Sequence, residues 1–321
     1  MVVVVVGLNG AVQRRVRLKT KLAPGTVNRG VEASTGVGGK GQGAWLAARA
    51  AGLGDALLAQ FCDDDLETLL RRRAPGCDEG LWVRVASKTR VCTTLVDDED
   101  ATEIVEPSGE IQSAEFDELL RRLPRAAAVL VMGSIPPGLD ASAYRTIVDH
   151  CAPSQLVLLD TVHGLREGAW RGAVLKVNAR ELLGLAGIDD DHRSDSAAPR
   201  DADQLGNAAA LVARRFGFEA VLWTDSKFPA GALVDGALYS LRLPALPGSV
   251  SSPIGAGDAV AGATLAGFVR PQRDDRLPRI LAAFAFGLAC GAASCLTPDN
   301  AAFDIALARQ LRADTNVLRL H

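Results

Sequence analysis

The sequence predicts an α/β protein of three layers, in which helices cover both faces of a mainly parallel β-sheet. Residues 2–6 form an unbroken run of valine, typical of a strand buried on both faces of a parallel sheet. Further strand patterns alternate with helical patterns along the chain. Two stretches, residues 14–19 and 81–96, alternate polar and apolar residues outside this order, so we expect strands there with one solvated face.

The expected elements follow in chain order. We expect helices at residues 41–54 and 63–73, a strand at 127–132, a helix at 144–150, strands at 156–160 and 173–177, and a short helix at 180–185. A helix at 205–216 leads into a strand at 220–224 and a hairpin that reaches residue 243, and helices after Asp258 and Leu277 complete the chain. Ligands of such a sheet bind at the carboxyl ends of its strands.

Composition and charge exclude several classes of protein. The 321 residues suffice for a large buried core, and 48% apolar with 23% charged residues is typical of a soluble globular protein. A formal net charge of −3 gives no basic field for nucleic acid or anionic membrane. The six cysteines form no Cys-x-x-Cys pair, so we expect reduced, buried thiols, and the four histidines are too scattered for a metal site.

Three stretches bear on localisation and insertions. The first residues lack the basic segment of a signal peptide and predict a strand. Residues 280–296 are uncharged, and we interpret them as a core helix, with a transmembrane span as the alternative. Residues 188–204 are rich in aspartate and predict a solvated loop, more typical of an insertion than of a site. We therefore expect a cytoplasmic protein, or one of an organelle stroma.

The strongest local signal is Pro253-Ile-Gly-Ala-Gly-Asp258, which runs into a small-residue helix. A turn of Gly255, Ala256 and Gly257 that opens a helix leaves backbone N–H groups unpaired at the positive end of the helix dipole, which is an anion cradle. Asp258 would repel an anion but suits a general base for a group that attacks the anion. The alternative is an ordinary helix start in which Asp258 is a capping residue.

Two further motifs remain ambiguous on local grounds. Residues 36–41 fit G-x-G-x-x-G but lie about thirty residues after the first strand, which weakens a dinucleotide-binding interpretation, and no Ser or Thr follows Lys40 as a Walker A motif requires. Asn178 and Glu181 stand three residues apart at a predicted helix start. This spacing fits a capping box as well as it fits a functional pair.

These motifs, in this order, resemble those of the ribokinase-like (PfkB-type) carbohydrate kinases. The similarity runs from about residue 3 to about residue 300 and includes the Gly-Ala-Gly-Asp turn, residues 38–41, Thr89-Arg90, residues 133–138 (Gly-Ser-Ile-Pro-Pro-Gly) and residues 176–181. The Thr-Arg and Gly-Ser-x-Pro-Pro-Gly elements look most like the 1-phosphofructokinase and tagatose-6-phosphate kinase branch. The resemblance implies one ribokinase-like domain over residues 1–321, with a small β-sheet lid formed by about residues 10–36 and 81–110.

The resemblance also implies roles for individual residues. It implies that ATP and Mg²⁺ are bound and that Asp258 is the base, with the backbone of residues 255–258 stabilising the transferred phosphoryl group. By the same resemblance, the residues expected to bind the acceptor are Asn9, Gln13, Gly38, Gly39, Lys40, Gly43, Arg90 and Ser134. Nucleotide binding falls to Lys176, Asn178, Glu181, Thr224, Ser226, Gly255, Gly257 and Gly287, with Glu181 organising magnesium through water. Many relatives in this family dimerise through their lids, so the resemblance also implies a possible homodimer.

The chain departs from the family pattern at residues expected to contact the sugar. Gln13 stands where the family has Asp, Gly10 replaces Pro, and Gly43 replaces Asn, while residues 225–230 replace a shorter glycine-rich turn. We therefore expect a kinase for a sugar or sugar phosphate whose specificity differs from that branch. The rival hypothesis is a catalytically weak homologue that binds a ligand or a partner, and a third, a nicotinamide-dependent oxidoreductase, rests only on the glycine pattern.

Overall fold

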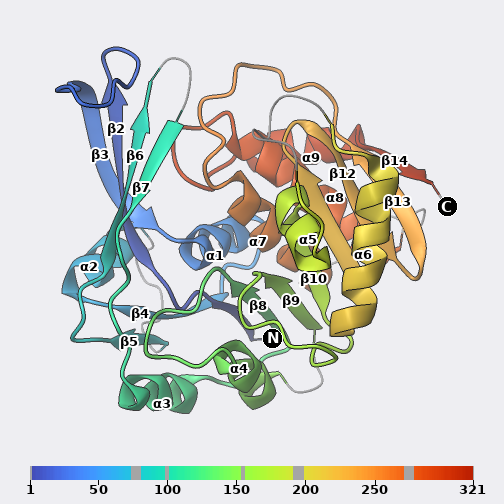
Figure 1. The fold of residues 1–321 in the computed structure, drawn as a ribbon, viewed down its shortest axis with the longest axis horizontal. Helices are drawn as coiled ribbons and strands as arrows, with labels where there is room; N and C mark the ends of the chain where they lie inside the picture. Colours follow the sequence, from blue (N-terminus) through green and yellow to red (C-terminus); the bar gives the residue numbers. More distant parts are fainter. Residues whose placement is uncertain are drawn as a thin grey trace.

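The computed structural model describes residues 2–73, 81–97, 101–152, 156–190, 199–270 and 278–320, and it confirms the α/β class. The described strands form a ten-stranded sheet and a four-stranded sheet (Figure 1). In spatial order the large sheet contains β14 (Asn316–Arg319), β13 (Ala237–Arg242), β12 (Phe228–Val234), β11 (Ala220–Asp225), β10 (Val174–Asn178), β9 (Leu156–Asp160), β8 (Ala128–Met132), β1 (Val3–Val6), β4 (Leu57–Cys62) and β5 (Trp82–Arg84). The strands from β11 to β5 pair in parallel, and β12, β13 and β14 add an antiparallel edge.

The valine run forms the strand at the centre of the parallel region. Successive side chains of β1 point to opposite faces, so Val4 and Val6 enter one hydrophobic core and Val3 and Val5 the other. Each of the four is at most 3% exposed. A β-branched strand with no polar residue therefore lies where two helical layers bury both of its faces.

The helices divide between these two cores, which gives the predicted three layers. One face of the sheet is covered by α3 (Ser113–Arg122), α4 (Ala143–Cys151), α5 (Ala179–Ala186) and α6 (Ala202–Phe216). The other is covered by α1 (Lys40–Ala50), α2 (Asp64–Arg73), α7 (Ala256–Val269) and α8 (Arg279–Ser294), and α9 (Ile305–Ala313) packs on the outside of α8.

The small sheet projects from the body on one side of α1 (Figure 1). Its order is β3 (Gly30–Gly38), β2 (Ala11–Leu18), β6 (Arg90–Val96) and β7 (Ala101–Val105), with β2 and β6 parallel. The assignment of residues 81–84 to this sheet was wrong. Trp82 and Val83 are buried, and β5 pairs with β4, so these residues extend the large sheet instead.

Several elements were not predicted from the sequence. Residues 57–62 form β4 and residues 113–122 form α3, and both α9 and β14 follow the helix expected to end the chain. The apolar run at residues 280–296 lies mostly in α8, a core helix packed between α7 and α9. In the part of the chain that the structure describes, no helix has the length and apolar character needed to cross a membrane.

The aspartate-rich stretch departs from the predicted loop at two places, because Arg200 is buried and residues 202–204 already belong to α6. Arg200 forms ion pairs with Asp190 and with Asp225 at the end of β11, and the side chains of Arg200 and Asp225 are nearly inaccessible. The sequence could not show these ion pairs, because a buried arginine paired with two carboxylates and a solvated loop contain the same residue types. Residues 191–198, like Cys77, lie outside the described residues. Of the other cysteines, Cys62, Cys92, Cys151 and Cys290 are unpaired and buried, whereas Cys295 is half-buried.

Candidate active site

The site lies where the strand order of the large sheet reverses. From β1 the chain adds β4 and β5 on one side and then returns to place β8, β9, β10 and β11 on the other. The loops that leave the carboxyl ends of β1 and β8 therefore run in opposite directions and open a crevice between them. Several residues that the motifs single out gather at this point.

Close backbone contact fixes the position of Lys40. A Cβ atom added to Gly41 would lie 2.4 Å from the Cα atom of Gly7, so only glycine at both positions lets the start of α1 rest on the end of β1. Gly39, with φ of +90°, is the N-cap residue of this helix, and Gly38 ends β3. The glycine-rich stretch thus delivers the Lys40 side chain into the crevice.

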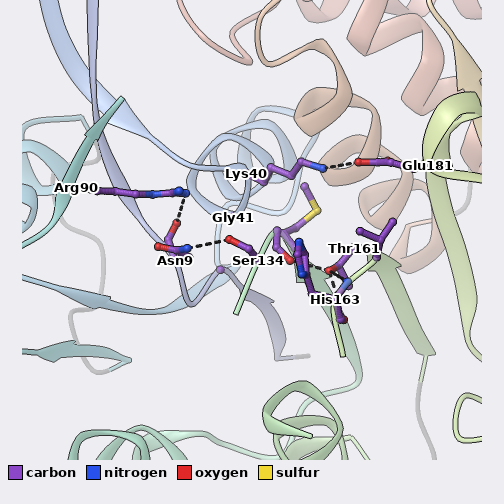
Figure 2. A pocket seen from close by; sticks show the side chains of 12 residues that line it. Asn9, Lys40, Gly41, Arg90, Ser134, Thr161, His163 and Glu181 are labelled. Atoms are coloured by element: carbon purple, nitrogen blue, oxygen red, sulfur yellow. Dashed lines mark hydrogen bonds and ion pairs between the residues drawn. The ribbon is translucent and has the colours of Figure 1, made fainter. Parts of the chain in front are cut away.

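A pocket of about 180 Å³ fills the crevice, and five predicted residues line it: Asn9, Lys40, Arg90, Ser134 and Glu181. Figure 2 shows Arg90, Asn9 and Ser134 together on one side, while Lys40 extends toward Glu181 on the other. Thr161 and His163, which follow β9, also line the pocket. Neither was predicted, although both come directly after an expected strand, which was the available signal.

Asn9 organises the acceptor side of the pocket. Its side-chain Nδ2 donates to the hydroxyl of Ser134 at 2.8 Å, and its Oδ1 accepts from the hydroxyl of Ser108 at 2.9 Å. The guanidinium of Arg90 donates through Nη2 to the carbonyl of Asn9 at 3.2 Å. Arg90 also lines the pocket, and its buried Nε has no acceptor among the described residues.

A buried carboxylate that sequence reasoning missed joins the two lysines. Asp160, the last residue of β9, lies 2.5 Å from the Nζ of Lys176 and 3.5 Å from the Nζ of Lys40. Burial alone would raise the pKa of Asp160, but the two ammonium groups outweigh it and hold that pKa below its ordinary value. The charge of Asp160 is in turn the main cause of the raised pKa of Lys40.

Asp258 lies in the first turn of α7, against α1. A Cβ atom on Gly43 would lie 2.6 Å from the Oδ2 atom of Asp258, so the carboxylate occupies the space that a side chain at position 43 would need. Gly43 follows Lys40 by three residues on α1, which puts both on one face of the helix. Burial, and next the charge of Asp160, raise the pKa of Asp258 to about 7.

The turn before Asp258 has the predicted form of an anion cradle. Gly255 is the N-cap residue of α7 in the left-handed conformation, with φ of +81°. Ala256 donates its N–H to the carbonyl of Pro253, and Ala259 to that of Gly255, whereas the N–H groups of Gly257 and Asp258 have no backbone acceptor among the described residues. The Nζ of Lys176 lies below the turn and donates to the carbonyl of Gly257 at 3.1 Å. Two amides are therefore available at the positive end of α7.

The Asn178 and Glu181 pair forms the capping box that the sequence allowed, and Glu181 also reaches the pocket. Asn178 caps α5 through its Oδ1, while Glu181 Oε2 accepts from the N–H of Asn178, which completes a capping box. The other carboxylate oxygen, Oε1, accepts from Lys40 at 3.2 Å and faces the pocket. In the described residues no group of three or more His, Cys, Asp and Glu side chains could hold a metal ion.

The remaining predicted residues lie at different distances from the pocket. Thr224 pairs with Asn178 one residue before the end of β11, and Ser226 follows the strand with φ of +52°. Gly287 is buried against α7, where a Cβ atom would lie 2.1 Å from the hydroxyl of Thr264, so helix packing alone requires glycine there. Gln13 does not line the pocket, because its amide donates to the buried Thr94 of the small sheet.

Comparisons with known proteins agree over nearly the whole chain. The sequence profile of the pfkB family carbohydrate kinases matches residues 3–304. The fold is similar to that of a possible 1-phosphofructokinase from Thermotoga maritima (18% identity, 100% of each chain covered, TM-score 0.78). It is also similar to phosphofructokinase-2 from Escherichia coli in complex with fructose-6-phosphate (17% identity, 97% of this chain and 98% of that chain covered, TM-score 0.77). Ribokinase from Arabidopsis thaliana, complexed with ribose and ATP, gives 16% identity, 97% and 98% coverage, and a TM-score of 0.72.

Proposed function

Because the chain belongs to the pfkB family of carbohydrate kinases, we propose that it transfers the γ-phosphate of ATP to a hydroxyl group of a sugar or sugar phosphate, with Asp258 as the general base. The family supports a sugar kinase in general terms. The observation that carries the specific proposal is the position of Asp258: its carboxylate lies against Gly43, one turn along α1 from Lys40 of the pocket, and in the same helical turn as the two unpaired amides.

Asp258 suits the base because of its raised pKa. A carboxyl group with a pKa of about 7 is half deprotonated near neutral pH and accepts a proton more readily than an ordinary aspartate. In the proposed step the acceptor hydroxyl attacks the γ-phosphorus in line with the bond that breaks, and its proton passes to Asp258. The bond from phosphorus to the β-γ bridging oxygen breaks, and ADP leaves with that oxygen.

The amides of Gly257 and Asp258 would stabilise the transferred group. Negative charge spreads over its equatorial oxygens in the transition state, and preorganised N–H donors at the start of α7 would stabilise that charge without reorganising. Lys176 supports the turn from below through the Gly257 carbonyl, and Asp160 in turn orients Lys176. Lys40, paired with Asp160 and Glu181, stands between the acceptor side and the phosphate side.

The residues present also fit a magnesium ion held through water. Glu181 directs Oε1 at the pocket from the end of the sheet that carries Asn178 and Thr224. Magnesium keeps several waters and needs few protein ligands, so one carboxylate in this position is chemically adequate. When bound, the ion would supply positive charge to the phosphates of ATP. Lys176, Asn178, Thr224 and Ser226, with Gly287 behind them, remain the proposed nucleotide side.

For the acceptor we propose a molecule that can use Arg90, Ser134 and Asn9. A guanidinium holds phosphate strongly, and Arg90 lines the pocket together with Asn9 and Ser134. This supports a sugar phosphate of the kind used by the 1-phosphofructokinase and tagatose-6-phosphate kinase branch, with a different choice of sugar because neither Gln13 nor Gly43 lines the pocket.

We also propose a cytoplasmic location and a homodimer formed through the small sheet. Apolar side chains are exposed on and beside that sheet, namely Val27, Val31, Ile104 and Val105, each more than 50% accessible. Burying such side chains favours association. Light scattering coupled to size exclusion tests the proposal, since a monomer at micromolar concentration would contradict it.

The direct experiment measures ADP release from Mg-ATP across free sugars, sugar phosphates and nucleosides, with Asp258→Asn beside the wild type. We expect one acceptor class to give turnover that the variant loses. Arg90→Gln then sorts the acceptors: it should raise the KM of a phosphorylated acceptor and leave that of a neutral sugar almost unchanged. Exposed Arg29→Gln is the matched control. Equal ADP release by wild type and Asp258→Asn with every acceptor would contradict the proposal.

A second candidate, binding without efficient turnover, is favoured by one observation. Gln13 bonds to Thr94 and Gly43 has no side chain, so two expected sugar contacts are missing from the pocket. Calorimetric titration of the same acceptors separates the two functions. Binding of an acceptor without ADP release above the Asp258→Asn background would favour the binding protein.

A further inference from the structure

The anion turn rests on a second segment that the proposed mechanism does not use. Residues 297–302 follow α8, and Asn300 lies directly against Gly255. A Cβ atom on Gly255 would be 1.5 Å from the Oδ1 atom of Asn300 and 2.8 Å from the backbone nitrogen of Ala301. The Asn300 amide therefore fills the space beside the residue whose left-handed conformation starts the cradle.

The contact is steric, because no hydrogen bond accounts for it. The Oδ1 atom of Asn300 is buried and has no donor among the described residues. A buried amide oxygen without a partner is unfavourable, so the surrounding chain must hold it in place. Ala301 does so with φ of +55° and 1% exposure, packed with Ala47 of α1 and Ala259 of α7. A strained, buried residue beside the cradle marks a segment whose conformation is fixed from several sides.

Two arginines from distant parts of the chain hold the other end of this segment. The Nη1 atom of Arg15 donates to the carbonyl of Pro298 at 2.9 Å, and Arg73 of α2 lies 3.0 Å from the carboxylate of Asp299. Arg15 belongs to β2, which pairs with β6, whose first residue, Arg90, lines the pocket. The small sheet and the cradle are thus connected through residues 298–301.

We propose that residues 298–301 act as a strut that couples the small sheet to the anion turn, with Asn300 as its positioning residue. Arg15 and Arg73 hold Pro298 and Asp299, and Asn300 keeps Gly255 where the following amides point at the phosphate. The inference rests on the proposed function only in taking the amides of Gly257 and Asp258 as the phosphate cradle.

Hydrogen exchange followed by mass spectrometry tests the coupling without any substrate. Asn300→Ala and Arg15→Gln should each accelerate exchange in peptides that cover residues 252–262. Arg14→Gln is the matched control for Arg15, because it changes the adjacent residue of β2, which points to the opposite face of the sheet. Exposed Asn207→Ala of α6 is the control for Asn300, and neither control should change exchange at the cradle.

Kinetics with the identified acceptor give the second readout. Asn300→Ala should lower kcat by roughly 10- to 10²-fold, the cost of a misplacement of about 1 Å, with the acceptor KM almost unchanged. A merely destabilised variant would lose active protein without this division between kcat and KM. The double variant should be no slower than Asn300→Ala alone, because the two residues act through one strut.

The outcomes separate the strut from the proposed function. Unchanged exchange at residues 252–262 in both variants, or strictly additive losses of kcat, would overturn the strut even if the protein is an active kinase. Accelerated exchange in both variants, with no turnover of any acceptor by the wild type, would support the strut and remove the proposed function.

Discussion

The acceptor side and the phosphate side of the candidate site are built in different ways. On the acceptor side, Asn9, Ser134 and Arg90 are joined by single hydrogen bonds at the edge of a small sheet whose strand β7 is exposed along its whole length. On the phosphate side, Asp160 and Lys176 are 2% and 3% exposed and bonded to each other. We therefore expect a substitution on the acceptor side to cost little free energy of unfolding, whereas one on the phosphate side should cost much more.

Two residues at which we expected departures from the family pattern fall on different sides of this division. Gln13 lies in the small sheet, where its amide donates to the hydroxyl of Thr94. Gly43, expected on the acceptor side, instead gives room to the Asp258 carboxylate. A residue interpreted as a lost sugar contact therefore belongs structurally to the phosphate side.

The largest effect is expected at Asp258. Asp258→Asn removes the proton acceptor, so kcat should fall by at least ~10²–10⁴-fold. In the wild type, kcat/KM should rise with pH up to about 7 and level off above it, because the base is active when deprotonated and its pKa is about 7. Initial rates between pH 5 and 9 measure both, and a flat profile below pH 7 would contradict the assignment.

The same substitution, Asp258→Asn, should lower the rate but raise the stability of the fold at alkaline pH. The pKa of Asp258 is higher in the folded protein than its ordinary value of 3.8. The carboxylate therefore destabilises the fold progressively as the pH rises from about 4 through 7. Asp258→Asn should melt at a higher temperature than the wild type at pH 8, and this difference should shrink toward pH 5.

The next effect is on stability, at Lys176. Lys176→Met leaves Asp160 buried with only the more distant Lys40 as a partner. Breaking a buried ion pair from one side costs about 3–5 kcal/mol in free energy of unfolding, which urea denaturation can measure. The exposed Lys19→Met is the control. A loss below about 1 kcal/mol, the range of surface ion pairs, would place Lys176 with the adaptable acceptor side.

A smaller effect on rate tests the boundary at Gly43. Gly43→Ala places a Cβ atom 2.6 Å from Oδ2 of Asp258, so the carboxylate must move. We expect a loss of kcat of up to ~10²-fold, the cost of a misplaced reacting group, while the acceptor KM changes little. Gly184→Ala on α5, where a Cβ atom would meet nothing within 4 Å, is the matched control. If instead only the acceptor KM changed, Gly43 would belong to sugar recognition.

The sequence predicted the layers well because burial on both faces leaves a periodic record. The valine run of β1 and the apolar α8 are examples, since both lie among buried apolar side chains. The strand β5 was assigned to the wrong sheet, because a three-residue strand at a sheet edge has the same local sequence in either sheet. Pairing between distant strands decides that question and leaves no local pattern.

The site was predicted where motifs are local and missed where partners are distant. The turn at residues 255–258 could be predicted from consecutive residues, and the helix begins there in the structure. Asp160 could not, because its significance lies in Lys40 and Lys176, which are 120 and 16 residues away. A carboxylate at the end of an apolar strand was the only available signal, and it is shared by many structural residues.

The smallest effect is expected at Gln13, on the acceptor side. Because its amide is bonded to Thr94 and does not line the pocket, Gln13→Ala should cost about 0.5–1.5 kcal/mol of stability, the value of one hydrogen bond. The acceptor KM should change by less than about twofold, since no substrate contact is lost. Thr94→Val, which removes the acceptor instead, should reproduce the stability loss. A tenfold rise in KM with Gln13→Ala but not with Thr94→Val would show that Gln13 turns toward the bound sugar, and the acceptor side would then be as tightly determined as the phosphate side.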